Sequence, residues 1–546
     1  MTFNLIHEKW IPVRRQDGTR SIIAPWQVTD NLDGNPITVL DAPRPDFSGA
    51  LIQFLIGLVQ TTMAPKNDGE WRAGLTNPSS PDQLKQSFES VIFAFNLDGD
   101  GPRFLQDFSP LEGKEKEIGA LLIDAPGKST VEKNTDFFVK RGLIKGMCRA
   151  CVTAALFTLQ TNAPQGGRGQ RTSLRGGGPL TTLIVGDTIW QTIWLNILLE
   201  NTLDRRLENP QRREKSNVFS WLMPTRTSQN DTGKSTTPLD VHPLHVYWGM
   251  PRRIRLTING LGKGICSVCG ELSQSLVGGY ITKKHGMDYD GAWLHPLTPY
   301  TQIPGEVPNS VKGQPGGVHY RHWLGLVLAD QDRGRMPARV VNEFWERQLK
   351  WPELHSLLRR GARIWAFGYD VDTMKARCWY EETMPLLQIS EDVRSAYEEI
   401  AARLVKTAVL IAGNVRRCVK QAMFRRPVDV KGDLSLIDAS FWRITESDFY
   451  LLLEQCRAKL RTGAELTSLK LEWLKTLKVA GDQIFDEWSQ NNQLEAADSR
   501  RIALAAIELR RLNAQGNKKV REILDLPKSI GFKNPPPSSI AVTQAI

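Results

Sequence analysis

Hydrophobic positions along the chain follow two different patterns, and the change from one to the other falls near Pro385. Before it, short β-branched runs alternate with longer stretches in which apolar residues recur every three or four positions. The pattern predicts a strand over residues 5–13, a helix over 47–63, a short strand over 180–185 and a buried helix over 189–203. Residues 1–385 are therefore expected to form one large mixed α/β domain.

Two segments of this region are polar and rich in residues that interrupt regular structure. Residues 205–240 contain many Ser, Thr and Pro residues, and residues 301–317 are rich in Pro and Gly. Such a composition is typical of loops, and we expect the first segment to be mobile.

The chain after Pro385 has the pattern of amphipathic helices. Apolar residues recur at spacings of three and four, at Tyr397, Ile400, Leu404, Ala408, Ile411, Val415, Cys418 and Ala422. Thr445 and Asp448 resemble a capping box that opens a second helix, and residues 468–490 and 497–512 supply two more. We predict a four-helix bundle over residues 386–530, and hence an α+β fold, with a disordered Pro-rich tail over 531–546.

The composition is that of an ordinary globular protein. The 546 residues are 41% hydrophobic and 24% charged, so the chain can bury a large core without disulfides. The N-terminal segment lacks the basic and apolar regions of a signal peptide. The most apolar stretch, residues 189–199, is too short to span a bilayer. We therefore expect a cytoplasmic protein that does not associate with membranes.

Positive charge is concentrated in one part of the chain. The formal net charge is +11 and the isoelectric point is about 9.2. No Asp or Glu occurs between Phe137 and Gly186. The same window contains Lys140, Arg141, Lys145, Arg149, Arg168, Arg171 and Arg175. A basic window without acids is a candidate surface for phosphate contacts, and the alternative is a solvated basic face without a ligand.

Two Cys-x-x-Cys pairs are the strongest local signal for chemistry. Cys148 and Cys151 form one pair, and Cys266 and Cys269 form the other, inside a glycine-rich turn that ends at Gly270. One pair supplies two thiolates, whereas a closed structural zinc site takes four ligands, so together the pairs predict one Zn²⁺ site. The alternatives are two unrelated thiol pairs or a redox motif.

The other three cysteines, Cys378, Cys418 and Cys456, stand alone in the sequence and are expected to be core thiols.

A run of glycines and arginines follows the first cysteine pair. It extends from Gln165, Gly166, Gly167, Arg168 and Gly169 to the three glycines at 176–178. Glycines let backbone N–H groups approach a phosphate or a groove edge, and arginines add charge and paired donors. A flexible surface loop can have the same composition, so the run alone does not establish a nucleic-acid site.

No catalytic signature is complete, and we expect that the protein is not an enzyme. Two segments resemble phosphate-binding loops, but Ser228 and Leu122 stand where each would need its first glycine. His319 and His322 have no acidic residue nearby in the sequence that would complete a nuclease site.

Several motifs of the chain resemble the CasA family, the large subunit of the type I-E CRISPR Cascade surveillance complex. The most specific segment runs from Cys148 through Asn162-Ala-Pro164 and Ser173-Leu-Arg-Gly-Gly177 to Pro179-Leu-Thr-Thr182. The opening residues 4–13, the second cysteine pair, Trp293-Leu-His-Pro296 and Gly368-Tyr369 follow in the order of the family.

The resemblance implies a non-catalytic subunit of an RNA-guided antiviral complex. Such a subunit reads the short protospacer-adjacent motif of target double-stranded DNA from the minor groove and helps to open the duplex for guide pairing. It contacts the 5′ handle of the guide RNA and other Cascade subunits, and it recruits a helicase–nuclease. Base pairing then reads the remaining sequence.

The resemblance also implies roles for individual residues. The family's glycine loop matches Gln165, Gly166, Gly167, Arg168 and Gly169. Its minor-groove lysine matches Lys284, beside Lys283, and its duplex-opening wedge matches Asp372 and Thr373. Phe137 matches the loop that touches the guide handle and the motif region, and the four cysteines match the zinc ligands.

The wedge differs from the family pattern. Members carry amides there, whereas this chain carries an acid, which is unfavourable opposite phosphates.

Two other classes of protein fit parts of the sequence. One is a zinc-ribbon nucleic-acid-binding subunit of a different assembly, and the other is a metal-dependent nuclease. A gene neighbourhood that encodes small Cascade subunits next to a CRISPR array would decide for the Cascade subunit over the first, and activity on DNA by the isolated chain with Mg²⁺ would decide for the second.

Overall fold

The computed structural model describes residues 2–134, 136, 141–203, 217–229, 233–258, 261–372, 375–431, 434–490 and 498–527. The chain divides into two compact units, Met1–Ser390 and Glu391–Ile546. The division falls after the 386–390 segment because Leu386, Leu387 and Ile389 are buried and the Leu386 N–H donates to the carbonyl oxygen of Ala362. The predicted disordered tail at 531–546 lies outside the described residues.

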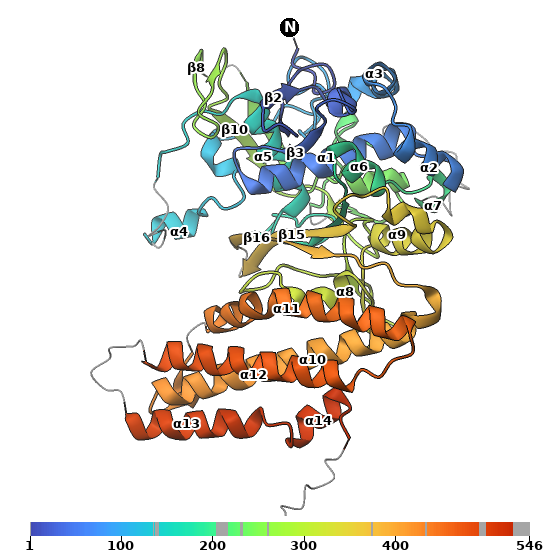
Figure 1. The fold of residues 1–546 in the computed structure, drawn as a ribbon. Coiled ribbons are helices and arrows are strands. Elements are labelled where there is room, and N and C mark those ends of the chain that lie inside the picture. Colours follow the sequence, from blue (N-terminus) through green and yellow to red (C-terminus); the bar gives the residue numbers. More distant parts are fainter. Residues whose placement is uncertain are drawn as a thin grey trace, which may run out of the picture. The chain divides into compact units, whose positions relative to one another are not determined.

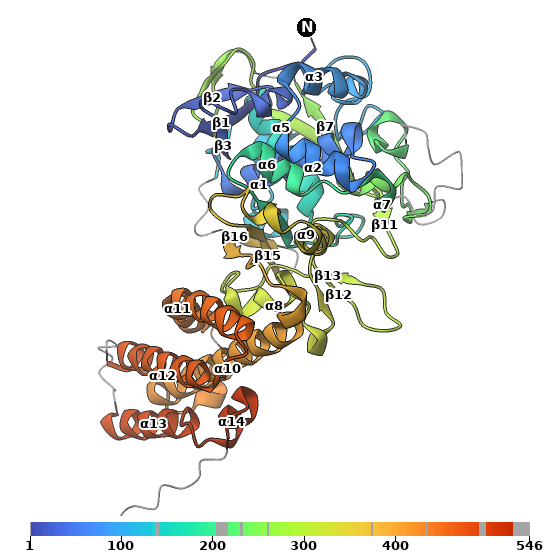
Figure 2. The same cartoon turned by 45° about the vertical axis from the view of Figure 1, so that its right-hand side comes forward.

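The first unit begins with a small antiparallel sheet. Its strand order is β2-β1-β3, with β1 at Ile11–Arg15, β2 at Arg20–Ile23 and β3 at Ile37–Leu40 (Figure 2). The predicted strand over residues 5–13 is wrong in its first half. Residues before Ile11 form a turn closed by the Glu8 N–H and the Asn4 carbonyl oxygen, and Asn4 pairs with Asn96.

Helix α1 (Pro45–Met63) lies at the centre of the first unit, close to the predicted helix at 47–63 (Figure 1). It packs against α5 (Arg149–Asn162). The ring of Phe54 meets five other aromatic rings edge-on, those of Trp10, Phe95, Phe104, Phe157 and Trp248. This aromatic core fixes α5, and with it the segments that begin and end α5.

The predicted strand at 180–185 is present as β5 (Thr181–Val185). It pairs with the long hairpin of β15 (Arg363–Asp372) and β16 (Lys375–Pro385), in the order β16-β15-β5.

The predicted helix at 189–203 is interrupted, because α6 (Ile189–Leu195) stops before Asn196 and α7 covers Glu200–Leu203. The Asn196 amide accepts from the Ile184 N–H at 2.9 Å and donates to the Ile184 carbonyl oxygen at 2.8 Å. These two bonds hold the chain on β5 and end the helix.

The polar segment at 205–240 is not a mobile loop throughout. Its described part includes Phe219 and Trp221, which are 1% and 0% exposed. The Trp221 indole N–H donates to the carbonyl oxygen of Ala94 at 2.6 Å. These two aromatic side chains join the core around Phe95, so this part of the segment is anchored.

Short strands and helices complete the described part of the first unit. The sheets are β4-β10-β7 (Lys116–Glu117, Gly279–Lys283, Arg253–Thr257), β8-β9 (Gly264–Ile265, Leu272–Ser273), β13-β12-β14 (Asn309–Ser310, Tyr300–Thr301, Arg335–Met336) and β11-β6 (Asp288–Tyr289, Ser235–Thr236). The helices are α2 (Asp68–Thr76), α3 (Pro81–Glu89), α4 (Lys128–Glu132), α8 (Trp323–Leu326) and α9 (Arg339–Lys350). The expected loop at 301–317 thus contains two strand residues at 309–310 and starts at the end of a strand.

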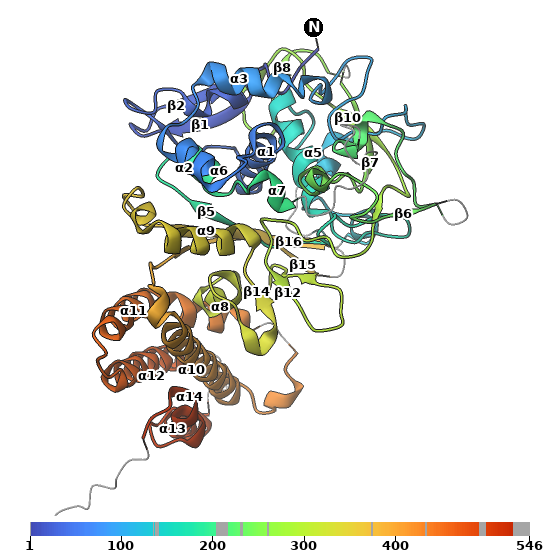
Figure 3. The same cartoon turned by 90° about the vertical axis from the view of Figure 1, so that its right-hand side faces the viewer.

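The second unit is helical, as the periodicity predicts. Its described helices are α10 (Glu391–Met423), α11 (Ser435–Arg461), α12 (Thr467–Gln490), α13 (Ser499–Leu512) and α14 (Lys518–Leu524). Figure 3 looks nearly along α10, which contacts each of the other four. The four predicted helices are present, and the short α14 adds a fifth that packs on α10.

One predicted helix boundary is wrong. Helix α11 begins at Ser435, so Thr445 lies within it, fully buried, and its hydroxyl donates to the Phe441 carbonyl oxygen at 2.8 Å. The capping-box pattern at Thr445 is therefore a coincidence of spacing. Within the described part of the chain, none of the helices combines the length and apolar character that crossing a bilayer requires.

Candidate functional site

The second cysteine pair lies on the β8–β9 hairpin. The Cys266 N–H donates to the Glu271 carbonyl oxygen at 2.9 Å, and the Gly270 N–H donates to the Cys266 carbonyl oxygen at 3.0 Å. Gly270 has φ +76°, a conformation in which glycine has no steric penalty. The turn therefore brings Cys266 and Cys269 to the same side of the hairpin end.

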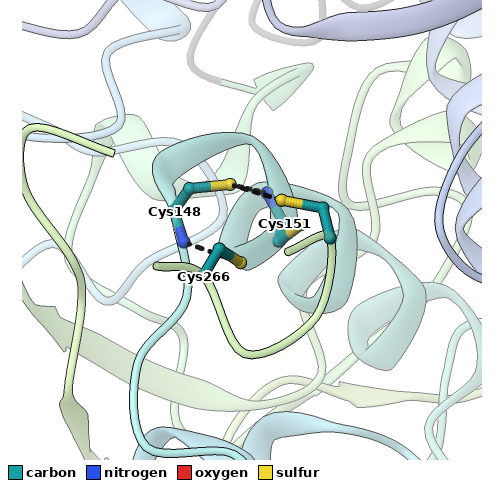
Figure 4. A group of neighbouring side chains, drawn as sticks. Cys148, Cys151 and Cys266 are labelled. Atoms are coloured by element: carbon teal, nitrogen blue, oxygen red, sulfur yellow. Dashed lines mark hydrogen bonds between the residues drawn. The ribbon is translucent and has the colours of Figure 1, made fainter. Parts of the chain in front are cut away.

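The first pair is fixed by a helix terminus. Cys148 is the N-cap residue of α5, and its Sγ accepts from the Cys151 N–H at 3.4 Å (Figure 4). The Cys148 N–H in turn points to Sγ of Cys266 at 3.3 Å. A helix N-terminus favours negative charge, so it suits a thiolate ligand.

Backbone pairing closes the long sequence separation between the two cysteine pairs. Met147 and Val277 exchange two backbone hydrogen bonds, at 3.0 and 2.8 Å. Next to them, the Ser267 N–H donates to the Gly146 carbonyl oxygen, and the Ser267 hydroxyl oxygen accepts from the Lys145 and Gly146 N–H groups. The hairpin is thus attached to the chain entering α5, independently of any ion.

The four cysteine sulfur atoms form one compact donor set. All four lie within 4.8 Å of one another, and those of Cys148 and Cys269 are 3.8 Å apart. Hydrogen bonds from Cys148 and Cys151 lower the pKa of Cys269 to about 7, whereas the contact with Cys148 raises the pKa of Cys151. Four thiolates this close repel one another, and a bound cation would stabilise all of them. The arrangement can therefore hold a metal ion.

The remaining cysteines are of two kinds. Cys418 and Cys456 are fully buried among the helices of the second unit, as expected for core thiols. The same expectation is wrong for Cys378, which is exposed on β16.

The glycine loop, residues 165–169, lies directly against the end of β10. The His285 N–H donates to the Gly169 carbonyl oxygen at 2.7 Å. A side chain at Gly169 would meet the His285 ring and Cβ of Lys284, both at 3.0 Å. Gly169 also has φ +81°, so glycine is required here for both space and backbone conformation. Gln165, Gly167 and Arg168 are exposed, as are Lys283 and Lys284.

Hydrogen bonds from neighbouring residues hold this loop in place. The guanidinium of Arg252 donates to the Pro164 carbonyl oxygen at 2.5 Å and also to the Gln170 side chain. Arg171 donates to the Ser228 hydroxyl at 2.7 Å. The Ser228 N–H donates to the carbonyl oxygen of His285 at 3.3 Å. His285, Arg252 and Ser228 were not identified from the sequence, where no spacing or composition signal marks them.

The same glycine run also reaches the β15–β16 hairpin. Gly177 packs on Pro164 and Gln165, where a Cβ would lie 3.1 Å from Cα of Pro164. The next residue, Gly178, has φ +61°, and a Cβ there would lie 2.5 Å from Val371. The glycine loop, Lys284 and the strand that carries the predicted wedge are thus joined through successive contacts.

Asp372, at the end of β15, is paired. Its carboxylate lies 3.2 Å from Arg377, whose guanidinium also binds Asp370 at 2.8 Å. Asp370 is 4% exposed, so the arginine is held by a buried carboxylate as well as by Asp372. The other predicted wedge residue, Thr373, and the handle-contact residue Phe137 lie outside the described residues.

The basic window is less available for phosphates than the sequence implies. Three of its arginines pair with carboxylates: Arg141 with Asp136 at 2.6 Å, Arg149 with Asp98 at 2.9 Å and Arg171 with Asp288 at 3.0 Å. Arg175 is 5% exposed and donates to Gln53, Thr181 and Thr298, so its role is structural. Arg168 and Lys145 are exposed and form no ion pair with a described residue.

His319 and His322 serve the local backbone. Nδ1 of His322 accepts from the His319 N–H at 3.2 Å, and the His319 ring contacts the Gly316 carbonyl oxygen. Burial lowers the pKa of His319 to about 4 and that of His322 well below its usual value, which favours the neutral form of both rings.

Known proteins match the chain over most of its length. The structure of CasA from Thermus thermophilus is similar over 94% of this chain and 99% of that one, with 16% identity and a TM-score of 0.68. Cse1 from Thermobifida fusca is similar over 96% and 98%, also with 16% identity and a TM-score of 0.68. A chain of a CRISPR RNA-guided surveillance complex is similar over 94% and 99%, with 13% identity and a TM-score of 0.60. These likenesses establish the fold. The model of the CRISPR-associated protein Cse1 family matches residues 4–484, so the chain belongs to the Cse1 (CasA) family.

Proposed function

We propose that this chain is the non-catalytic large subunit of an RNA-guided type I-E Cascade complex, and that it reads the protospacer-adjacent motif of target double-stranded DNA from the minor groove. The observation that carries the proposal is the junction of the glycine loop with Lys284. Residues 165–169 and Lys284 are far apart in the sequence, yet the 2.7 Å bond between Gly169 and His285 places them side by side.

The chemistry of this junction suits a narrow groove. Exposed Gly167 has no heavy atom within 4 Å of the place its Cβ would take, so the loop presents bare backbone. Exposed Lys284 supplies a flexible cation and Arg168 a planar one. Minor-groove readers use basic side chains and a close backbone approach to distinguish base pairs by groove width and acceptor pattern.

The wedge is assigned to Asp372, at the end of β15, and to Thr373, which follows it in the sequence. Because Arg377 pairs with Asp372, the carboxylate does not present an uncompensated charge to the phosphates. This pairing accounts for the tolerance of an acid at this place, and the hairpin would open the duplex by its shape. Phe137 is assigned to contact with the 5′ handle of the guide RNA.

The metal of the four-cysteine site is assigned as Zn²⁺. Four thiolates in a compact group are the ligand set of tetrahedral structural zinc, with no open position for a reactive water. Cys148, Cys151, Cys266 and Cys269 would hold the ion and lock the β8–β9 hairpin to the start of α5. The role of the ion would be structural. We assign degradation of the target to a helicase–nuclease that the complex recruits.

The experiment is binding of target duplexes with a randomised motif by the complex reconstituted from this chain, guide RNA and the other Cascade subunits. We expect strong motif preference with the unmodified chain. Lys284→Ala and Gly167→Asp should each weaken binding by roughly tenfold or more, since a lost groove contact costs about 1–3 kcal/mol. Gly166 is a poor test position, because a side chain there would collide with Gln170 in the free protein.

The matched control is Lys9→Ala, an exposed lysine without a side-chain partner among the described residues. Unchanged motif-dependent binding by both test variants would show that the reading site lies elsewhere.

A further inference from the structure

A buried arginine joins the two ends of the glycine loop. The guanidinium of Arg252 donates to the carbonyl oxygen of Pro164, at 2.5 Å, and to the side-chain oxygen of Gln170. Pro164 directly precedes the loop at residues 165–169, and Gln170 directly follows it. Because both bonds come from one planar group, they fix the distance between the two ends of the loop.

The position of Arg252 is itself fixed from α5. The side chain of Gln160, which is 1% exposed on α5, accepts from the Arg252 N–H at 3.0 Å and donates to the Arg252 carbonyl oxygen at 2.9 Å. The same amide donates to the Leu105 carbonyl oxygen at 3.1 Å. An amide that bonds both backbone groups of one residue uses its donor and its acceptor on the same segment. The guanidinium of Arg252 therefore extends from a main chain that α5 holds in place.

Arg252 also lies next to the segment that carries Lys284. The following residue, Arg253, begins β7 and pairs with the last residue of β10. Two positions after Lys284, a Cβ at Gly286 would lie 2.0 Å from the carbonyl oxygen of Pro251 and 3.5 Å from Cα of Arg252. The chain around Arg252 thus contacts the segments on both sides of Lys284. One residue therefore links the backbone position of this lysine to both ends of the glycine loop.

The guanidinium has no acidic partner that competes with the loop. Arg252 is 9% exposed and forms no ion pair with a described residue, and its Nε has no hydrogen-bond partner among them. Buried arginines usually pair with a carboxylate. For this one, the two acceptors at the ends of the loop take that place. Hydrogen bonds from a charged donor are stronger than neutral ones, so the geometry of the loop depends on this group.

The two ends of the loop differ in their other contacts. At the exit, the Gln170 N–H donates to the Gly167 carbonyl oxygen at 2.9 Å, and this bond does not involve the guanidinium. At the entrance, the carbonyl oxygen of Pro164 accepts from Arg252, and Gly177 packs against the same residue. Without the guanidinium, the entrance of the loop should therefore move relative to the lysine.

We propose that Arg252 is a positioning residue that sets the motif selectivity of this subunit. The inference rests on the proposed function, in which the glycine loop and Lys284 contact the minor groove. Such a reader distinguishes base pairs only if its backbone and its cation keep a fixed spacing. Arg252 itself contacts no DNA. It keeps that spacing, so that poorly fitting motifs are rejected.

The test measures the affinity of the reconstituted complex for a library of motif-bearing duplexes and for one motif-free duplex. Arg252→Gln removes the bridge between the ends of the loop. Arg252→Lys keeps a charge, but an ammonium group lacks the rigid fork of donors that holds two acceptors at once. Arg347→Gln is the matched control, because Arg347 on α9 is 1% exposed and contacts Ile197 and Trp71 instead of the loop.

We expect Arg252→Gln to lower affinity for the best motif about tenfold, the size of one lost base-pair contact. Affinity for the motif-free duplex should stay within about twofold, because non-specific binding depends on exposed charge. The ratio between the best motif and the others should shrink accordingly, and Arg252→Lys should recover only part of it. Thermal unfolding shows whether each variant is folded at the temperature of the binding assay. A general loss of stability would lower all affinities alike, whereas a displaced loop changes their ranking.

Three results would overturn the proposal. The first is an unchanged ratio in Arg252→Gln. The second is a ratio that Arg252→Lys restores in full, because charge alone would then be sufficient. The third is an equal loss of the ratio in Arg347→Gln, because the effect would then follow from stability. If Arg252→Gln does not fold, Gln170→Ala removes one end of the bridge from the side of the loop, and an unchanged ratio in that variant would have the same meaning.

Failure of this inference can be told apart from failure of the proposed function. If the unmodified chain prefers certain motifs and the Arg252 variants keep the same ranking, the reading site stays in place and only the role of Arg252 is wrong. If the unmodified chain shows no motif preference, the reading site and the positioning role are both wrong.

Discussion

The main-chain N–H of His285 donates to the carbonyl oxygen of Gly169, and both residues adopt the left-handed backbone conformation, with φ of +62° and +81°. A non-glycine residue with positive φ is uncommon and costs conformational energy. In this protein the non-glycine residue with positive φ, His285, lies at the contact between the glycine loop and Lys284. The surrounding bonds from Arg252 and Ser228 hold both segments in this geometry.

Gly169→Ala should disturb this contact. The new Cβ would approach the His285 ring and Lys284 to 3.0 Å, in a backbone conformation that costs alanine about 1–2 kcal/mol. We expect motif-dependent DNA binding to fall about tenfold and the free energy of unfolding to fall by about 1–2 kcal/mol. Binding to the motif library and thermal unfolding measure the two effects separately.

Gly101→Ala is the matched control, because a Cβ at this exposed position outside the glycine loop also meets nothing within 4 Å. Equal loss of binding in the two variants would mean that the effect of Gly169→Ala does not come from the contact with His285.

Purified protein should contain one zinc ion per chain. Cys266→Ser should remove it and lower the free energy of unfolding by several kcal/mol, since metal binding at structural sites contributes directly to folding. Elemental analysis and chemical denaturation are the measurements. Cys378→Ser, at an exposed position on β16, is the control and should keep both values unchanged. Zinc that remained at full occupancy in Cys266→Ser would contradict the four-ligand assignment.

The pairing of Arg377 with Asp370 and Asp372 predicts opposite effects of two substitutions. Asp372→Asn removes a charge near the path of the DNA and should leave binding equal or slightly tighter. Arg377→Gln removes the cation that pairs with both carboxylates, one of them buried, and should weaken target binding and cost about 1–2 kcal/mol of stability. Duplex-opening assays with a fluorescent base near the motif report on the hairpin directly. Weaker binding by Asp372→Asn would give this carboxylate a contact of its own.

The sequence predicts those parts of the molecule whose pattern lies within a short stretch of neighbouring residues. Periodicity locates α1, β5 and the helices of the second unit, and Cys-x-x-Cys spacing identifies the four sulfur atoms that the structure brings within 4.8 Å. Contacts between distant segments have no such signal. Asn196 ends α6 because its amide bonds to Ile184 on β5, and the sequence alone does not show that these residues meet.

The same limit applies to the candidate DNA site. Arg175 lies in the most basic stretch of the chain, yet it is buried and bonded to Gln53, which lies far away in the sequence. Conversely, the exposed Lys283 and Lys284 stand outside that stretch, and only the bond between His285 and Gly169 places them beside the glycine loop. Charge density along the sequence therefore locates this surface poorly, because burial and pairing decide which cations remain available.

The two units should differ in function as well as in structure. Each has its own core: aromatic rings around Phe54 in Met1–Ser390, and apolar helix faces around α10 in Glu391–Ile546. The glycine loop, Lys284 and the hairpin all belong to the first unit. We therefore expect residues 1–390 to retain motif preference when the second unit is deleted, and residues 391–527 to fold alone without motif preference. Arg417, Lys420 and Arg425 of the second unit would add non-specific, salt-sensitive affinity.

Deletion should then lower total DNA affinity and the salt slope together, while the ratio of motif-bearing to motif-free binding stays the same. As the salt concentration rises, the ratio of motif-bearing to motif-free binding should fall less than total affinity does, because groove shape and steric fit depend less on ion release. Titration of both duplexes at two salt concentrations, with the intact and the shortened subunit, separates these quantities. Loss of the ratio at unchanged total affinity would place the motif reader among α10–α14, because the first unit would then bind DNA without discriminating between sequences.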